Sequence, residues 1–383
     1  MVKPAKYKDN PTLDAGFQEE TEMHSYHVRP RQLTSLAFRI GIQKTFLFLF
    51  SVFLFIFALE LMKNGARGIA PLIVNLFKVD SLLNALGFGW LFAYLVMSGS
   101  PVAAAALTFL DAGAVDRLGA FAMITGSRLG AAFIVLFIGF VYILRGHERR
   151  SALSIGLLSL IVTASIYLPA LVVGGMLLQH RVLDSVQLNR GGTLSSILDQ
   201  VFAPLIQPLI GVLPGWLIFL VGLGIIILSF YLFDRALPAL HLERSSFGQT
   251  ARLVYRPLSM FALGSILTLL TMSVSLSLSL LVPLSARGYV RRENVIPYIM
   301  GANITTFVDT LLAAVLIGNP DAFTVVLVEV LSVAIISLMV LLLFFHNYEQ
   351  AMLRLVALTA NSKRNLAVFI FLIFITPLML ILL

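Results

Sequence analysis

Residues with oxygen-bearing side chains interrupt an apolar run of the chain between Thr271 and Thr310. Such groups cost free energy at membrane depth unless they bind or solvate something. The segment therefore predicts a site that binds a substrate. Its candidate residues are Ser273, Ser275, Asn303, Thr305, Thr306 and Asp309.

A divergent copy of this segment lies 175 residues earlier in the chain (97 against 272, 126 against 301). Met97-Ser98-Gly99-Ser100 aligns with Met272-Ser273-Val274-Ser275 without a gap. Several matches at one offset, in matching order, indicate an internal duplication, and such repeats are common in secondary transporters. Further pairs at this offset are Gly126 with Gly301, Gly89 with Gly264 and Arg117 with Arg292.

Composition defines the class of protein that must position these residues. Of the 383 residues, 59% are hydrophobic and 12% are charged. A soluble domain could not bury that much apolar surface, so we expect an all-α polytopic membrane protein. The net charge of +8 fits lysine and arginine in cytoplasmic loops and does not require a nucleic-acid partner. The chain has no cysteine, which excludes disulfides, thiolate nucleophiles and cysteine-ligated metals.

Helix breaks in both copies shape the expected fold. Ser98-Gly99-Ser100-Pro101 interrupts one apolar run, and the serine-rich segment interrupts the other. If both runs are re-entrant hairpins, the basic loops fall on one side, the cytoplasmic one, and the two copies are inverted. We therefore expect inverted-topology repeats, each with a re-entrant helical hairpin and a broken spanning helix. We expect Ile69–Phe77 to be a separate amphipathic piece and the segment around Arg354 to be a loop.

We expect five divisions of the chain. Residues 1–35 form a cytoplasmic tail that is disordered or lies on the surface, and residues 36–145 form the first repeat, with its hairpin at 82–112. Residues 146–213 form a connecting span and loop, residues 214–318 the second repeat, with its hairpin at 257–286, and residues 319–383 the C-terminal spans.

These motifs resemble the type II sodium–phosphate cotransporter family. In that family each repeat carries a Gln-Ser-Ser-Ser-like segment and then a Gly-Ala-Asn-Ile-Gly-Thr-Thr-like segment. The second copy here has Met272–Ser275 and Gly301–Thr306 at the matching places, and Phe57–Gly65 looks like the family's opening helix. The resemblance covers about Thr45 to Ile317. It implies sodium-coupled transport of phosphate or a similar small oxyanion, with hydroxyls of both repeats around the ions.

The chain departs from the family pattern at several positions. Methionine replaces the glutamine in both copies, at Met97 and Met272. In the first copy Arg128 stands where the family has asparagine, and two alanines replace the threonines. In the second copy Asp309 stands where a later threonine is usual. An arginine repels sodium and attracts an anion, so the coupling ion is an open question.

The candidate site combines both copies. Asp309 follows Thr305 by one helical turn, so we expect both on one face. Asp309 is a candidate to bind a cation, to carry a proton, or to neutralise Arg128. Glu329 is a candidate ion relay or a contact between helices. The expected substrate-binding residues are Ser98, Ser100, Ser273, Ser275, Arg128, Asn303, Thr305 and Thr306, and those for cation or proton coupling are Asp309, Ser98, Ser273, Thr306 and Glu329.

The predicted function is secondary active transport of phosphate or a similar oxyanion, with sodium the suspected metal and no other cofactor. The alternatives are a proton-coupled or uncoupled transporter of another small solute, and a transport-inactive scaffold. An enzyme is not expected, because the acids are scattered singly. We expect a multi-pass protein of the plasma membrane, or the inner membrane of a bacterium, with a cytoplasmic N-terminus. Its partners would be the oxyanion, sodium or a proton, the lipid bilayer and, by analogy, a second copy in a homodimer.

Overall fold

The computed structural model describes residues 30–75, 81–144, 149–186, 192–237, 256–274, 276–278, 281 and 290–383. The chain forms two units, Met1–Phe46 and Leu47–Leu383. The regular secondary structure of the described residues is helical throughout. Residues 1–29 of the expected tail lie outside the described residues, and α1 begins at Pro30 and ends at Asn75.

Seven helical segments of the described residues are long and apolar enough to cross a membrane. This agrees with the expected all-α membrane protein. The segments are Ile42–Asn75, Arg117–Phe140, Leu153–Gln179, Gly215–Ala236, Arg292–Ile317, Pro320–Ala360 and Lys363–Leu382.

Several apolar helices are too short to cross a membrane alone. Helices α2 (Leu82–Val96) and α9 (Pro257–Thr271) have 15 residues each, or about 22 Å at the rise of an α-helix, against a hydrocarbon core of about 30 Å. Both end at a methionine in the left-handed region, Met97 with φ 54° and Met272 with φ 50°. The chain therefore breaks at the same point of both copies, and α3 (Ser100–Asp111) begins directly after the first break.

The helices that follow differ between the two copies. In the second copy the helix is interrupted at Thr306–Phe307, between α11 (Arg292–Thr305) and α12 (Val308–Ile317). In the first copy α4 (Arg117–Leu144) is continuous. The expectation of a broken spanning helix in the first repeat is therefore wrong. Where the second copy breaks, α4 has Ala131 and Ala132, and alanine is the strongest helix former.

Glycines bring each short helix against its neighbour in the same way. A Cβ at Gly89 of α2 would lie under 3.0 Å from the carbonyl oxygen of Met123 on α4, and one at Gly264 of α9 would meet that of Tyr298 on α11 in the same way. In the reverse direction, a Cβ at Gly126 would meet the Leu86 carbonyl, and one at Gly301 would meet the Phe261 carbonyl. All these partners are related by the 175-residue offset, so the pairs α2–α4 and α9–α11 pack through corresponding backbone contacts.

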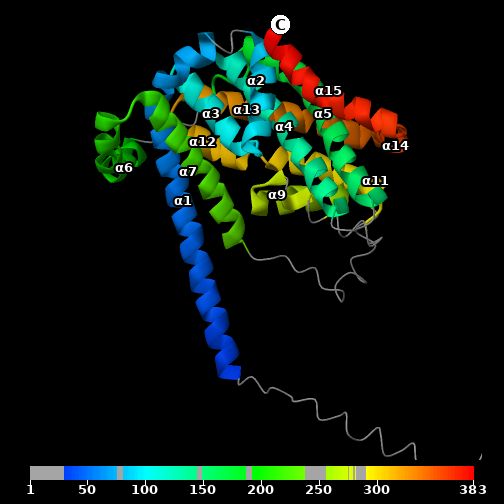
Figure 1. Cartoon of the computed structure of the whole chain (residues 1–383), viewed down its shortest axis with the longest axis horizontal. Coiled ribbons are helices and arrows are strands. Elements are labelled where there is room, and N and C mark those ends of the chain that lie inside the picture. The colour runs from blue at the N-terminus through cyan, green and yellow to red at the C-terminus, as the bar shows by residue number, and fades with distance from the viewer. Residues whose placement is uncertain are drawn as a thin grey trace, which may run out of the picture. The chain divides into compact units, whose positions relative to one another are not determined.

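Helix α3 lies in the core of the bundle and touches α4, α7, α12 and α13. Its residues Pro101–Leu110 are all buried, and the alanines among them allow the close approach of neighbouring helices. Three further helices follow in the chain: α5 (Arg149–Gln179), α6 (Gly192–Val212) and α7 (Gly215–Ala236). Figure 1 shows α3 beside α4 and α12. The residues that follow the first break are thus held by a packed core.

Two local expectations need correction. The segment around Arg354 is not a loop but α14 (Phe345–Ala360), which follows α13 (Pro320–Met339) and a π-helical turn at Val340–Phe344. Met352 and Val356, one turn apart, are buried on the side of α14 that packs on α5. The helical spacing of these apolar residues indicates the helix.

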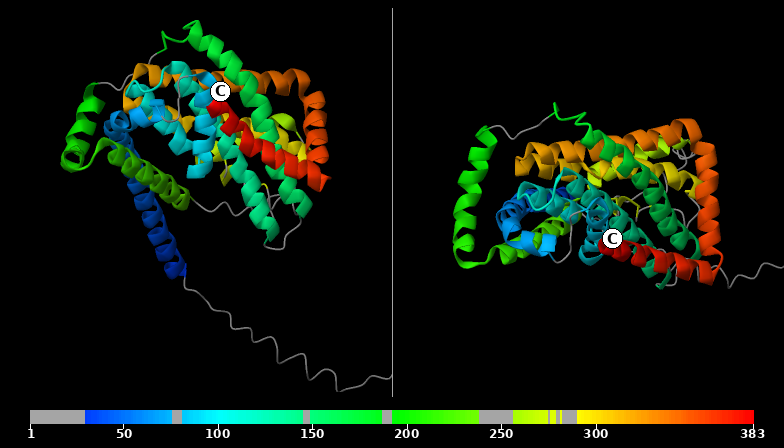
Figure 2. Two further views of the ribbon diagram at one scale, coloured as in Figure 1. Left: turned by 45° about the horizontal axis from the view of Figure 1, so that its top comes forward. Right: turned by 90° about the horizontal axis from the view of Figure 1, so that it is seen from above.

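Ile69–Asn75 belongs to α1 and is not a separate piece, because Ile69 and Ile73 continue the buried face of α1. Figure 2 shows α13, α14 and α15 (Lys363–Leu382) following one another along three sides of the bundle.

An ionic cluster joins the start of α4, the start of α13 and the segment after α5. Arg117 Nη1 donates to Asp184 at 2.8 Å, and its Nη2 pairs with Asp321. Beside them Asn319 Nδ2 donates to Asp111 at 3.2 Å. These contacts tie one end of the bundle together.

Candidate functional site

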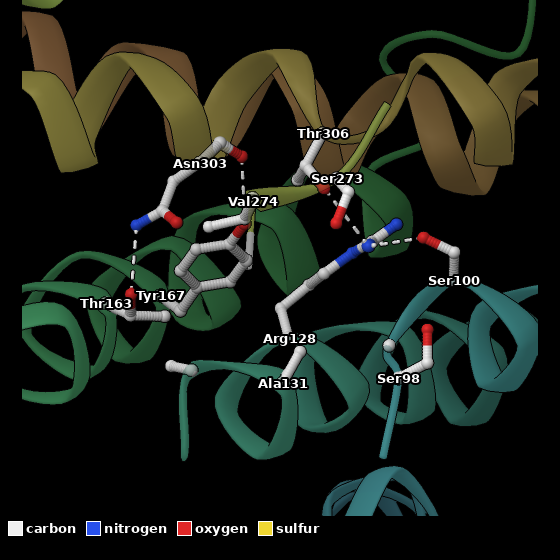
Figure 3. Close-up of a pocket in the computed structure, with 12 residues that line it drawn as sticks. Ser98, Ser100, Arg128, Ala131, Thr163, Tyr167, Ser273, Val274, Asn303 and Thr306 are labelled. Atoms are coloured by element: carbon white, nitrogen blue, oxygen red, sulfur yellow. Dashed lines mark hydrogen bonds between the residues drawn. The ribbon is translucent and has the colours of Figure 1, made fainter. Parts of the chain in front are cut away.

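The two helix breaks meet at an inner cavity of about 30 Å³. This volume is enough for one or two water molecules. Figure 3 shows that its walls come from both copies and from α5. The cavity brings together six of the predicted site residues: Ser98, Ser100, Arg128, Ser273, Asn303 and Thr306.

The first break supplies the N-terminal end of α3. Ser98 and Ser100 flank Gly99, and no side chain caps the N-terminus of this helix. The first N–H groups of a helix have no intrahelical acceptor and carry the positive end of its dipole. Gly99 allows the break to pack closely on α4, since a Cβ there would lie 3.0 Å from both the Ser127 carbonyl oxygen and the Ala131 Cβ. The break therefore presents hydroxyls and a positive helix end to the cavity.

The second copy contributes a capped break and an anchored amide. Ser273 Oγ accepts from the N–H of Leu276 at 3.2 Å, which is the usual role of an N-cap serine. Asn303 Nδ2 donates to Thr163 Oγ1 at 3.1 Å, and the Asn303 carbonyl accepts from Tyr167 Oη at 2.9 Å. That carbonyl lies four residues before the interruption at Phe307, where the normal helical acceptor geometry ends. Helix α5 thus holds the broken helix in place.

Arg128 crosses from the first copy to the second. Its Nη1 donates to Ser100 Oγ at 3.2 Å and Thr306 Oγ1 at 3.3 Å, and its Nη2 donates to Thr310 Oγ1 at 2.6 Å. The guanidinium carbon lies 4.7 Å from the centre of the Phe307 ring, a cation–π distance. The side chain is only 5% exposed. A permanent positive charge is therefore buried at the wall of the cavity.

Asp309 is the acidic partner of this arginine. Its Oδ1 lies 3.6 Å from Arg128 Nη2, with the side chain 2% exposed. Thr310 joins the two groups, because its hydroxyl accepts from Arg128 and donates to Asp309 Oδ1 at 2.9 Å. Arg128 Nε and Asp309 Oδ2 are buried without a hydrogen-bond partner. The pair is neutral overall but leaves one donor and one acceptor free.

The other predicted site residues lie elsewhere. Thr305 Oγ1 donates to the Ser265 carbonyl on α9 at 2.9 Å, so it does not line the cavity. Thr305 and Asp309 do not share a helix face, because the interruption at Thr306–Phe307 separates them. Glu329 is buried on α13 and accepts from Thr125 Oγ1 at 2.9 and 3.1 Å, outside the cavity wall. Ser275 lies outside the described residues.

A second, larger cavity of about 300 Å³ adjoins the first. Ser98 and Ser273 line both cavities. The larger one also contacts Asp234 and Tyr231 near the C-terminal end of α7, where Tyr231 is 50% exposed. The two serines therefore stand between an inner polar cavity and a space that reaches the protein surface.

Four residues of the site could not be found from the motif alone. Thr163 and Tyr167 come from α5, outside the duplicated segments, and nothing in their sequence surroundings marks them. Thr310 and Phe307 follow the motif, and their contacts with Arg128 depend on how α4 crosses α12. Thr310 ends the polar segment, but its spacing does not show that its hydroxyl contacts Arg128.

Comparison of the chain with protein-family models, with curated proteins and with solved structures finds no match.

Proposed function

We propose that this protein is a secondary transporter of phosphate or a similar small oxyanion. The observation that carries the proposal is the cavity at which both helix breaks meet, with the buried Arg128 at its wall. An intramembrane ionisable residue is a functional candidate by default. A guanidinium presents rigid N–H donors that match the geometry of an oxyanion.

The other groups around the cavity also favour an anion. Helix α3 directs an uncapped N-terminus toward it, and helix N-termini bind phosphate and similar ions through their N–H groups and dipole. Ser98 and Ser100 add hydroxyl donors beside that N-terminus. A single charge, a helix end and hydroxyls together form a donor-rich site.

We place the anion where the two cavities meet, at Ser98 and Ser273. The inner cavity of about 30 Å³ has room for water but not for a phosphate ion, whereas the adjoining space of about 300 Å³ has that room. Phosphate that enters from the larger cavity would reach the two serines first. Ser273 already caps its helix, so its hydroxyl proton is free to be donated to the anion.

Two features support inverted repeats with re-entrant hairpins. The corresponding glycine contacts of α2–α4 and α9–α11 are what a duplicated unit would retain, and α2 and α9 are too short to span. Broken helices from two inverted halves, with substrate between them, are a common design of secondary transporters. The resemblance to the sodium–phosphate cotransporter family is consistent with this design.

The arrangement also suggests an inward-facing state. The larger cavity lies beside Asp234, and α7 continues from there into a basic segment with Arg235 and Arg244, which the positive-inside rule assigns to the cytoplasm. The ionic cluster around Arg117 closes the opposite end. Opening to the other side would require this cluster to separate.

Uptake of radiolabelled phosphate into proteoliposomes tests the proposal. We expect saturable uptake that excess unlabelled phosphate inhibits. Ser98→Ala should raise the phosphate concentration for half-maximal uptake by about tenfold, and the double variant with Ser273→Ala by about a hundredfold, since each lost hydrogen bond to a charged group costs roughly 1.5–3 kcal/mol. The matched control is Thr359→Ala, whose hydroxyl donates to Leu355 on its own exposed helix. Absence of uptake and of binding for phosphate, sulfate and arsenate would refute the proposed function.

A further inference from the structure

We infer that Arg128 takes the place of a coupling cation, so that the site binds its oxyanion without sodium. The inference rests on the proposed function and defines what that site requires.

The oxygens best placed to hold a cation already contact Arg128. Its two terminal nitrogens donate to the hydroxyls of Ser100, Thr306 and Thr310 and lie beside the carboxylate of Asp309. Hydroxyl and carboxylate oxygens are the ligands that a hard cation uses. Three hydroxyls and one carboxylate around one positive charge form a complete cation site, in which the cation is part of the chain.

Two of the remaining predicted cation ligands have other partners. Glu329 accepts from Thr125 of α4, about one turn before Arg128, and does not line the cavity. Ser273 uses a lone pair to cap its helix. A sodium ion near Ser98 would lie close to the guanidinium, and two positive charges in a buried site repel strongly. The described residues therefore do not fit sodium at this place.

The arginine is fixed in the position of a bound ion. Its guanidinium is held from both copies, stacks on Phe307 at 4.7 Å and is buried. Its Nη1 reaches the first helix break through Ser100. Arginine stays charged under all physiological conditions, so this cation cannot leave. The donors left for an oxyanion are the hydroxyl of Ser98 and the N-terminus of α3, beside this fixed charge.

The aligned residue of the second copy suggests the decisive variant. Arg128 corresponds to Asn303 at the 175-residue offset. Arg128→Asn removes the tethered charge and frees the hydroxyls of Ser100, Thr306 and Thr310 and the Asp309 carboxylate. The emptied position would then offer oxygens to a diffusible cation.

The experiment measures phosphate binding by isothermal titration calorimetry with the full chain in nanodiscs. The buffers contain sodium chloride, potassium chloride or choline chloride at one ionic strength. We expect the wild-type protein to bind phosphate with the same Kd in all three. Arg128→Asn should weaken binding in choline by about tenfold or more, with partial recovery in sodium or in added guanidinium. Arg128→Lys, which keeps the charge, should show no dependence on sodium.

Different results separate the inference from the proposed function. Phosphate binding by the wild-type protein only in sodium would overturn the inference and leave the proposed function standing. Unchanged binding by Arg128→Asn in choline would also overturn it. No binding of phosphate in any salt would overturn both. The phosphate Kd of the wild-type protein in the three salts tests the inference even if Arg128→Asn does not fold.

Discussion

Replacing Arg128 by methionine removes the positive charge from an ion pair in which both side chains are buried. The methionine retains much of the volume of the arginine stem, so the main loss is electrostatic. Asp309 then keeps a carboxylate that is 2% exposed, with the hydroxyl of Thr310 as a donor at 2.9 Å. Its other oxygen already lacks a partner. The variant therefore leaves a buried carboxylate that keeps the N–H and hydroxyl of Thr310 as donors but loses its positive partner.

The size of the effect follows from the geometry. The charged atoms lie 3.6 Å apart, which corresponds to an attraction of about 5 kcal/mol at an effective dielectric constant of about 20. Breaking a buried pair by removing one partner costs about 3–5 kcal/mol in measured cases. We expect each of Arg128→Met and Asp309→Asn to lower the free energy of unfolding by about this amount. The double variant removes both charges and should lose less than the sum, with a coupling energy of about 2–3 kcal/mol.

Equilibrium unfolding in mixed micelles of increasing SDS fraction, followed by the fluorescence of Trp90 and Trp216, measures these differences. All four proteins of the cycle are compared under identical conditions. Additive losses in the double variant would show that Arg128 and Asp309 do not stabilise each other. In that case the pairing role is refuted, and Asp309 returns as a candidate for cation or proton coupling.

Three further predictions concern packing, a buried carboxylate and access. Gly126→Ala should lower the free energy of unfolding by about 1–3 kcal/mol through overpacking against α2. The control Gly224→Ala, with nothing within 4 Å of the new Cβ, should be neutral or stabilising in the same unfolding assay. Equal effects of the two variants would contradict the close packing of α2 and α4. Thr125→Val should cost about 1–3 kcal/mol, because it removes the hydroxyl that donates to the buried Glu329; an unchanged unfolding midpoint would argue against that contact. Ser98→Cys, in a chain without other cysteines, should react with a membrane-impermeant thiol reagent in inside-out vesicles and more slowly with phosphate present; reaction from the outer face alone would contradict the inward-facing state.

The helix breaks could be predicted because their causes are local. Gly99 and Pro101 cannot continue a helix without a conformational or hydrogen-bonding cost, and the serines of the second copy stand at the matching offset. A broken spanning helix was expected in both copies and occurs only in the second among the described residues, at Thr306–Phe307. Local composition explains the difference, since alanines in α4 favour a continuous helix.

The segment around Arg354 shows how charge can mislead. Lysine and arginine near Arg354 suggested a loop, although Tyr348, Met352 and Val356 repeat every four residues. That spacing forms the buried side of α14 against α5, where Tyr348 contacts Ser165 at 2.6 Å. A count of apolar positions at helical spacing would have predicted the helix.

The sequence alone predicted the membrane class and six residues that line the cavity, and its 175-residue offset indicates a duplication. These properties follow from composition, from spacing along the chain and from residue types that are costly in an apolar run. The tertiary structure decided which side chains contact one another across helices. Arg128 and Thr310 are 182 residues apart, and Thr305 and Thr306, adjacent in sequence, face α9 and the cavity respectively. Side-chain partners across helices depend on crossing geometry and on the exact point where a helix is interrupted, and neither is encoded in local spacing.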